Sequence, residues 1–91
     1  GSNKGGFGGK WAKDEGQVPG VPDLFLSIAR GGYHGLYIEM KTSENRALGI
    51  KKGRLSEQQK WMIERLEEEG YMCAVCYGCD EAVDAMKEYL G

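Results

Sequence analysis

Residues 36–42, LYIEMKT, decide the fold. Apolar side chains alternate along this stretch with tyrosine, glutamate and lysine, and successive side chains of a strand point to opposite faces. The pattern therefore predicts a strand with one apolar face and an opposite face on which Glu39 lies beside Lys41. Such a pair is frequent on plain solvent-exposed strands, and that interpretation stays open beside a functional one.

The segments on either side of this strand complete a sheet. Residues 23–29 alternate in the same way, and the short glycine-rich link over residues 30–35 predicts an antiparallel hairpin with residues 36–42. Residues 43–55 predict a loop, because glycines interrupt any period. Residues 71–77, YMCAVCY, are almost wholly apolar, which is typical of a strand covered on both faces.

Two helices follow from capping signals and apolar periodicity. Ser56 is a good N-cap residue, Gln59 completes a capping box, and Gly70 is suited to the C′ position. Asp80 is the predicted cap of the second helix. The predicted apolar stripes consist of Met62, Ile63 and Leu66 in the first helix and of Ala82, Val83, Met86 and Leu90 in the second.

The order of elements predicts an α/β fold. Counting a possible short strand at residues 10–12, it is strand, strand, strand, helix, strand, helix. The strand–helix–strand unit over residues 36–77 should place its two strands parallel, so we expect a mixed sheet flanked by helices. Residues 20–91 form the expected single core, preceded by a flexible glycine-rich segment over residues 1–19.

Charge is distributed unevenly along the chain. The net charge is −2, but residues 41–60 carry six lysines and arginines against two glutamates. Lys51, Lys52 and Arg54 cluster in the predicted loop, which is compatible with phosphate contacts and equally with a solvated mobile loop.

The sequence also bears on the cellular setting. No apolar run approaches a membrane span, and no signal-peptide pattern is present. The three cysteines, an odd number, argue against a disulfide framework. We therefore expect an intracellular protein with no membrane partner.

The spacing CxxCxxC of Cys73, Cys76 and Cys79 suggests a metal site. A structural zinc site or an iron–sulfur cluster needs a fourth ligand, and only His34, in a distant turn, is left. Cys73 and Cys76 are three residues apart and should point to opposite faces of their strand. We interpret them as small buried residues.

A metal site is better supported at the hairpin. Asp23 directly follows Pro22, and a register that places Asp23 beside Glu39 brings two carboxylates together near Lys41. Two oxygen ligands on fixed strands, with open positions for water and phosphate, are how proteins usually hold Mg²⁺. Such an ion lowers the pKa of bound water and neutralises charge on a phosphate, and a lysine holds the attacking water or stabilises the phosphate.

Four ordered segments, GVPDLFL, GLYIEMKT, RLSEQQKW and EEEGYMCAVCYG, resemble the VRR-NUC (virus-type replication–repair nuclease) family of the PD-(D/E)xK nuclease superfamily. The superfamily motif reads here as Pro22-Asp23 and Glu39-Met40-Lys41, and the resemblance covers about residues 20–90. It implies a restriction-endonuclease-like fold and endonucleolytic hydrolysis of DNA phosphodiester bonds that depends on Mg²⁺ or Mn²⁺.

The resemblance also implies roles for single residues. Asp23, Glu39 and the backbone carbonyl of Met40 would be metal ligands, and Lys41 the catalytic lysine. Gln59 matches the family's glutamine near the catalytic centre, although its place in a capping box explains it as well. Lys51, Lys52 and Arg54 would hold the DNA backbone.

Small members of the family that act alone look like Holliday-junction resolvases. The resemblance therefore implies branched DNA as substrate, a homodimer, a role in DNA repair and the cytoplasm of a bacterial or phage-infected cell. Family members usually begin with a helix that carries an acidic residue, but Asp14 and Glu15 lie in no helical pattern. That helix is shortened, supplied by a partner chain, or absent from a site with fewer ligands. The alternative function is a non-catalytic DNA- or protein-binding module.

Overall fold

The computed structural model describes residues 19–91. The elements are β1 (Leu24–Leu26), β2 (Leu36–Lys41), the 3-10 turn η1 (Arg46–Leu48), α2 (Glu57–Glu68), β3 (Met72–Tyr77) and α3 (Cys79–Leu90). The possible strand at residues 10–12, the acidic residues Asp14 and Glu15 and nearly all of the expected flexible segment lie outside the described residues.

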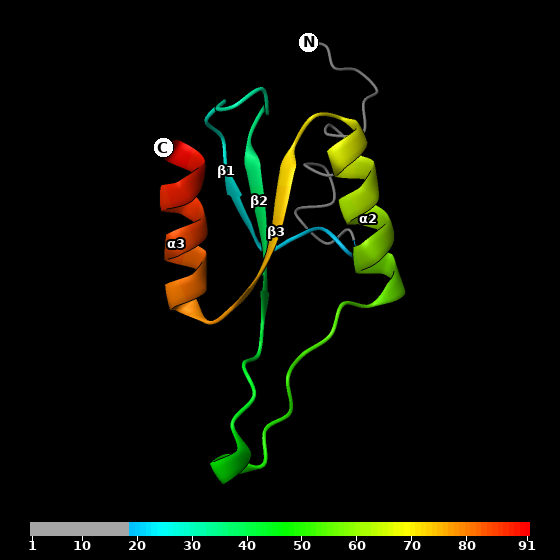
Figure 1. The fold of residues 1–91 in the computed structure, drawn as a ribbon. Coiled ribbons are helices and arrows are strands. Elements are labelled where there is room, and N and C mark those ends of the chain that lie inside the picture. The colour runs from blue at the N-terminus through cyan, green and yellow to red at the C-terminus, as the bar shows by residue number, and fades with distance from the viewer. Residues whose placement is uncertain (1–18) are drawn as a thin grey trace.

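The three strands form one mixed sheet, in the order β1-β2-β3. β1 pairs antiparallel with β2, and β2 pairs parallel with β3. The predicted α/β fold is thus confirmed, with α2 and α3 on opposite sides of the sheet (Figure 1). β1 is shorter than the predicted strand over residues 23–29: its ladder with β2 ends at Leu26, and the Ile28 carbonyl beyond it accepts a hydrogen bond from the Tyr89 hydroxyl of α3, at 2.6 Å.

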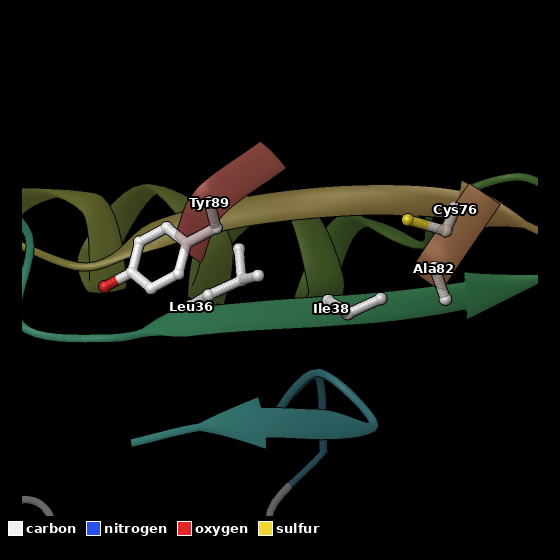
Figure 2. Packing of buried hydrophobic residues seen from close by; sticks show 5 residues of the cluster. All are labelled: Leu36, Ile38, Cys76, Ala82 and Tyr89. Atoms are coloured by element: carbon white, nitrogen blue, oxygen red, sulfur yellow. The ribbon is translucent and has the colours of Figure 1, made fainter. Parts of the chain in front are cut away.

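The core lies between the sheet and α3. Leu36 and Ile38 of β2 are each 1% exposed and pack with Cys76, Ala82 and Tyr89 (Figure 2). This confirms the apolar face predicted for residues 36–42. Partly buried side chains that complete this face are Leu26, Met40, Met72, Ala74, Ala85 and Met86.

The predicted stripe of α3 is confirmed at Ala82 and Met86 and wrong at Val83 and Leu90. Val83 and Leu90 are 43% and 40% exposed, whereas Ala82, Ala85, Met86 and Tyr89 face the sheet. The bond from the Tyr89 hydroxyl to Ile28 satisfies the polar end of the ring and so allows its burial. Asp80 is not the cap either: Gly78, with φ +99°, precedes the helix, which begins at Cys79.

α2 covers the other face of the sheet. Met62 and Leu66 are buried, as predicted. The capping box is confirmed, because the Ser56 hydroxyl accepts from the Gln59 N–H at 3.1 Å and the Gln59 side chain accepts from the Ser56 N–H at 2.9 Å. Gly70 follows the helix with φ +97°, a left-handed conformation that suits glycine at C′.

The two strand cysteines lie on opposite faces of β3, as predicted. Cys76 belongs to the core against α3, and the Cys73 thiol lies 4.0 Å from the Ile63 carbonyl of α2. Cys79 is exposed at the start of α3. Within residues 19–91, no group of three or more His, Cys, Asp and Glu side chains is arranged to hold a metal ion.

A long loop leaves the body of the protein between β2 and α2. We call residues 43–52 the finger; its base is closed by a hydrogen bond from the Gly53 N–H to the Thr42 carbonyl, at 2.9 Å. Asn45 and Ile50 bond to each other across the finger, and η1 forms its tip. Figure 1 shows the tip far from the sheet and from both helices.

Candidate active site

Asp23 and Glu39 meet where β1 begins beside β2. The ladder pairs Leu24 with Ile38, so Asp23 and Glu39 stand at the next level along the two strands. Asp23 is anchored there, because its Oδ2 accepts a hydrogen bond from the Met40 N–H at 2.9 Å. The predicted convergence of the two carboxylates is therefore present in the fold.

The segment before β1 lies against α2 and so carries Asp23 to this position. Gly20 has φ +90°, and a Cβ added there would lie 2.6 Å from the Gln58 carbonyl oxygen. A side chain at this position would push the segment away from the first turn of α2. Pro22, which is buried, then directs the chain into the strand at Asp23.

The main chain of Met40 faces the same edge as Asp23. The ladder with β1 stops at the Leu24–Ile38 pair, so among the described residues β2 has no strand beside Met40 on this side, while β3 pairs with Met40 on the other side. The two main-chain groups of one strand residue face the same neighbour, and the Met40 N–H faces Asp23. The Met40 carbonyl therefore points along this edge as well.

Glu39 is the buried charge of the site. It is 3% exposed, so the interpretation of this face as plainly solvent-exposed is wrong. Its Oε2 accepts a hydrogen bond from Gln59 Nε2 at 3.1 Å and lies 3.5 Å from Lys41 Nζ. Its Oε1 is buried with no hydrogen-bond partner among residues 19–91. An acceptor left in this state costs free energy unless another group supplies positive charge.

Gln59 links the carboxylate to the lysine. Its Oε1 accepts from Lys41 Nζ at 2.8 Å and also from the Ser56 N–H, while its Nε2 donates to Glu39. The same side chain therefore completes the capping box of α2 and holds the two charged groups of β2. Both interpretations of Gln59 hold geometrically, and they do not exclude each other.

Burial and Asp23 make Glu39 harder to ionise. Burial raises the pKa of Glu39 above its usual value and the nearby Asp23 carboxyl raises it further, while Lys41 acts in the opposite direction. Because burial and the neighbouring carboxyl outweigh the effect of Lys41, this carboxyl pair favours the binding of a cation. Burial also raises the pKa of Tyr37, which lies on the same face, so this phenol stays protonated at neutral pH and does not act as a base.

A basic groove opens beside the site. It has a volume of about 820 Å³, and its charged lining residues are Lys51, Lys52, Arg54 and Lys60 against Glu44 and Glu57, together with Tyr77. The ammonium of Lys52 lies 4.4 Å from the centre of the Tyr77 ring. Tyr77 pairs with Lys41 across the parallel strands, and Gly53, which also lines the groove, lies against the Lys41 side chain. The groove therefore lies next to the lysine of the site. The three loop cations predicted from the sequence thus line one groove.

Sequence reasoning missed Lys60 and Tyr77. Lys60 lies one residue after Gln59 on α2, and Tyr77 ends β3 at the level of Lys41. The parallel pairing of residues 36–42 with residues 71–77 was the signal that could have placed Tyr77 there. A separate apolar hollow of about 540 Å³, lined by Pro19, Trp61 and Met62 among others, holds none of the residues of the site.

The sequence model of the VRR-NUC domain family matches residues 8–80. A solved structure of a "VRR_NUC domain protein" is similar, with a TM-score of 0.70 and 37% sequence identity over 89% of this chain. The chain spans 61% of the length of that protein. No curated protein matches the sequence significantly. Within the described residues, no helix is both long enough and apolar enough to cross a membrane.

Proposed function

Because the chain belongs to the VRR-NUC domain family, we propose that it is a divalent-metal-dependent nuclease that hydrolyses DNA phosphodiester bonds. The observation that carries this proposal is the buried Glu39 carboxylate, whose Oε1 has no hydrogen-bond partner among the described residues while Lys41 and Gln59 hold its other oxygen. A buried acceptor of this kind beside a second carboxylate is suited to a hard cation.

The residues present fit Mg²⁺ or Mn²⁺. Asp23, Glu39 and the Met40 carbonyl would hold the ion, since all three are oxygen donors at one strand edge. When bound, such an ion lowers the pKa of water and neutralises charge on the phosphate. Two side-chain carboxylates leave positions for water and for a substrate oxygen.

Lys41 is the proposed catalytic lysine. Its ammonium is mostly buried and is fixed by Glu39 and Gln59, so it reaches a phosphate without losing much side-chain entropy. Its positive charge stabilises the pentacoordinate phosphate and orients the attacking water. Gln59 acts as a positioning residue, because its amide oxygen accepts from Lys41 and its amide nitrogen donates to Glu39.

The basic groove is the proposed path of the DNA backbone. Lys51, Lys52 and Arg54 would contact phosphates on one side of the scissile bond. A branched, Holliday-junction-like substrate and a two-fold dimer belong to the same proposal. A symmetric pair of sites would cut matching strands of a junction and would double the small contact area of one chain.

A nicking assay tests the proposal. Supercoiled plasmid and a four-way junction are incubated with the protein in Mn²⁺ or in EDTA, and the cleavage products are quantified on gels. We expect cleavage with Mn²⁺ only, and its loss in Lys41→Ala with DNA binding largely kept. Lys87→Ala, which removes an exposed lysine of α3, is the matched control and should cut like wild type. Equal nicking by wild type and Lys41→Ala would mean contamination.

A non-catalytic DNA-binding module is the second candidate. It is favoured by the two-carboxylate site, because no third acidic, histidine or cysteine side chain joins Asp23 and Glu39 within residues 19–91. Under this alternative the protein binds the four-way junction through the groove but cuts neither substrate with Mg²⁺ or Mn²⁺. Calorimetric titration with Mn²⁺ would then show no binding that depends on Glu39.

A further inference from the structure

The tip of the finger presents an apolar side chain to solvent. Leu48 is 71% exposed, which is more than any other large apolar side chain of the described residues, and Ile50 beside it is 39% exposed. Single exposed leucines are common on protein surfaces, so the exposure of Leu48 alone does not indicate a binding site. The question is why a leucine ends a segment that stands clear of the protein body (Figure 1).

The backbone at the tip of the finger has a defined, hydrogen-bonded structure. The Asn45 side chain caps η1 by accepting from the Leu48 N–H at 3.2 Å, and Gly49 closes the turn with φ +73°. Two backbone hydrogen bonds join Asn45 and Ile50 at 2.8 and 2.9 Å. The backbone that carries Leu48 is therefore fixed, which lowers the entropy cost of placing its side chain in a partner.

Charge identifies the partner. The finger carries Arg46, Lys51 and Lys52 against Glu44, and Arg54 follows directly after its base. Lys51, Lys52 and Arg54 line the basic groove, which lies next to Lys41. An apolar tip on a cationic stem matches the way in which DNA-bending proteins insert a leucine or isoleucine between base pairs while cations hold the phosphates.

We propose that the finger is a DNA wedge: Leu48 inserts at a base step and unstacks it, while the cations behind it hold the backbone. This inference rests on the proposed function, and it adds how the protein selects DNA that unstacks easily, as at a branch point or nick.

The geometry limits where the wedge acts. Lys41 and Leu48 are seven positions apart in the chain, and seven extended steps span at most about 25 Å. The base pairs of a duplex are stacked about 3.4 Å apart, so the unstacked step lies within about seven base pairs of the scissile phosphate. The Gly53–Thr42 hydrogen bond fixes the base of the finger next to Lys41 and so keeps this separation constant.

The test measures unstacking without cleavage. Duplex and four-way-junction DNA carry 2-aminopurine, whose emission rises when it is unstacked, at successive positions. They are titrated with Lys41→Ala protein, which leaves the DNA intact, and with the same protein carrying Leu48→Ala. We expect a several-fold rise in emission at one step, which Leu48→Ala largely abolishes together with a roughly tenfold loss of affinity, the scale of partly burying one leucine.

Two further variants distinguish insertion of Leu48 into DNA from nonspecific binding. Leu48→Lys adds a cation and removes the wedge, so affinity should be kept or raised while the emission rise is lost. Leu90→Ala, which truncates another exposed leucine on α3, should behave like the parent. Leu48 and Leu90 both lie at the surface, so neither variant removes a side chain of the buried core.

Three results would overturn the wedge. Equal emission and affinity in the parent and in Leu48→Ala would show that the tip does not enter DNA, while the nuclease proposal would stand. A change from dimer to monomer in Leu48→Ala by sedimentation, with unchanged emission per bound chain, would show that the tip contacts a second copy. Absence of DNA binding by every form, wild type with its Lys41 intact included, would overturn both proposals.

Discussion

Lys41 and Gln59 come from β2 and α2, and the lysine Nζ lies 2.8 Å from the glutamine Oε1. That oxygen also accepts from the Ser56 N–H, while the amide nitrogen donates to Glu39 at 3.1 Å. Position 59 therefore needs an acceptor at one end and a donor at the other. A glutamate, which serves equally well in an ordinary capping box, supplies only acceptors.

The first prediction concerns Gln59→Glu. The variant keeps the cap and the contact with Lys41 but places a carboxylate against Glu39, so cleavage should fall about 10- to 100-fold, the range for partners that orient a site. Ser56→Ala is the control: it loses the capping hydroxyl and about 1 kcal/mol of stability, but its cleavage rate should stay near that of wild type. Equal rates in Gln59→Glu and wild type would remove Gln59 from the mechanism.

The second prediction concerns Glu39→Gln in metal-free protein. Burial, with Asp23, raises the pKa of Glu39 above 4.5 in the folded state. Between 4.5 and the raised value the folded protein holds a proton that the unfolded chain has released, so wild-type stability declines relative to the variant as pH rises through this window. At neutral pH, Glu39→Gln should therefore melt at a higher temperature than wild type.

Thermal melting followed by circular dichroism in EDTA, from below pH 4.5 to neutrality, measures this difference. It should be smallest at the acidic end and grow towards neutrality. Addition of Mn²⁺ should reverse the order, because wild type gains stability by binding the ion and Glu39→Gln does not. A difference in melting temperature that is constant across the pH range would contradict a raised pKa of the buried Glu39 carboxyl.

The third prediction concerns the salt dependence of DNA binding. Each phosphate contact adds about one to the slope of log Kd against log salt concentration, because a condensed counterion is released. Replacing Lys51, Lys52 and Arg54 by alanine should therefore reduce the slope by about three. Binding isotherms at several salt concentrations measure this, with Lys87→Ala as the matched loss of a remote charge. An unchanged slope would place the DNA elsewhere.

The fourth prediction concerns the cysteines. Burial raises the pKa of Cys73 to about 11 and also raises that of Cys76, so both thiols are protonated and shielded at neutral pH. Cys79 is exposed. A thiol reagent should therefore modify one cysteine quickly in the native protein and all three in denaturant, and Cys79→Ser should lose the fast reaction. Three fast reactions in native protein would mean that β3 is not covered as described.

The sheet could be predicted because β2 has a strict period of two, and its neighbours are joined to it by a short hairpin and by a helix of crossover length. The burial of Glu39 could not be predicted from the sequence. Alternation places Glu39 opposite Leu36 and Ile38, but only the packing of α2 on that face decides whether it meets water or Gln59. A charged residue on the polar side of a strand carries no mark of burial.

The prediction that places Leu90 in the apolar stripe of α3 is wrong for a related reason. Tyr89 and Leu90 are neighbours on the helix, and apolar character alone favours leucine for the core. The hydroxyl of Tyr89 reaches the Ile28 carbonyl, sixty-one residues away in the chain, and this distant partner determines which side chain turns inward. The capping box succeeded because its two residues are local and their geometry needs no distant partner.

The hydrogen bond between Gly53 and Thr42 has a consequence for engineering. It seals the junction between the Glu39–Lys41 site and the projecting loop, so the ten residues beyond it form a replaceable cassette. On the proposed wedge role, grafting a loop of another length and tip at this junction would redirect the protein to a different nucleic-acid shape while the contacts among Glu39, Lys41 and Gln59 stay as they are.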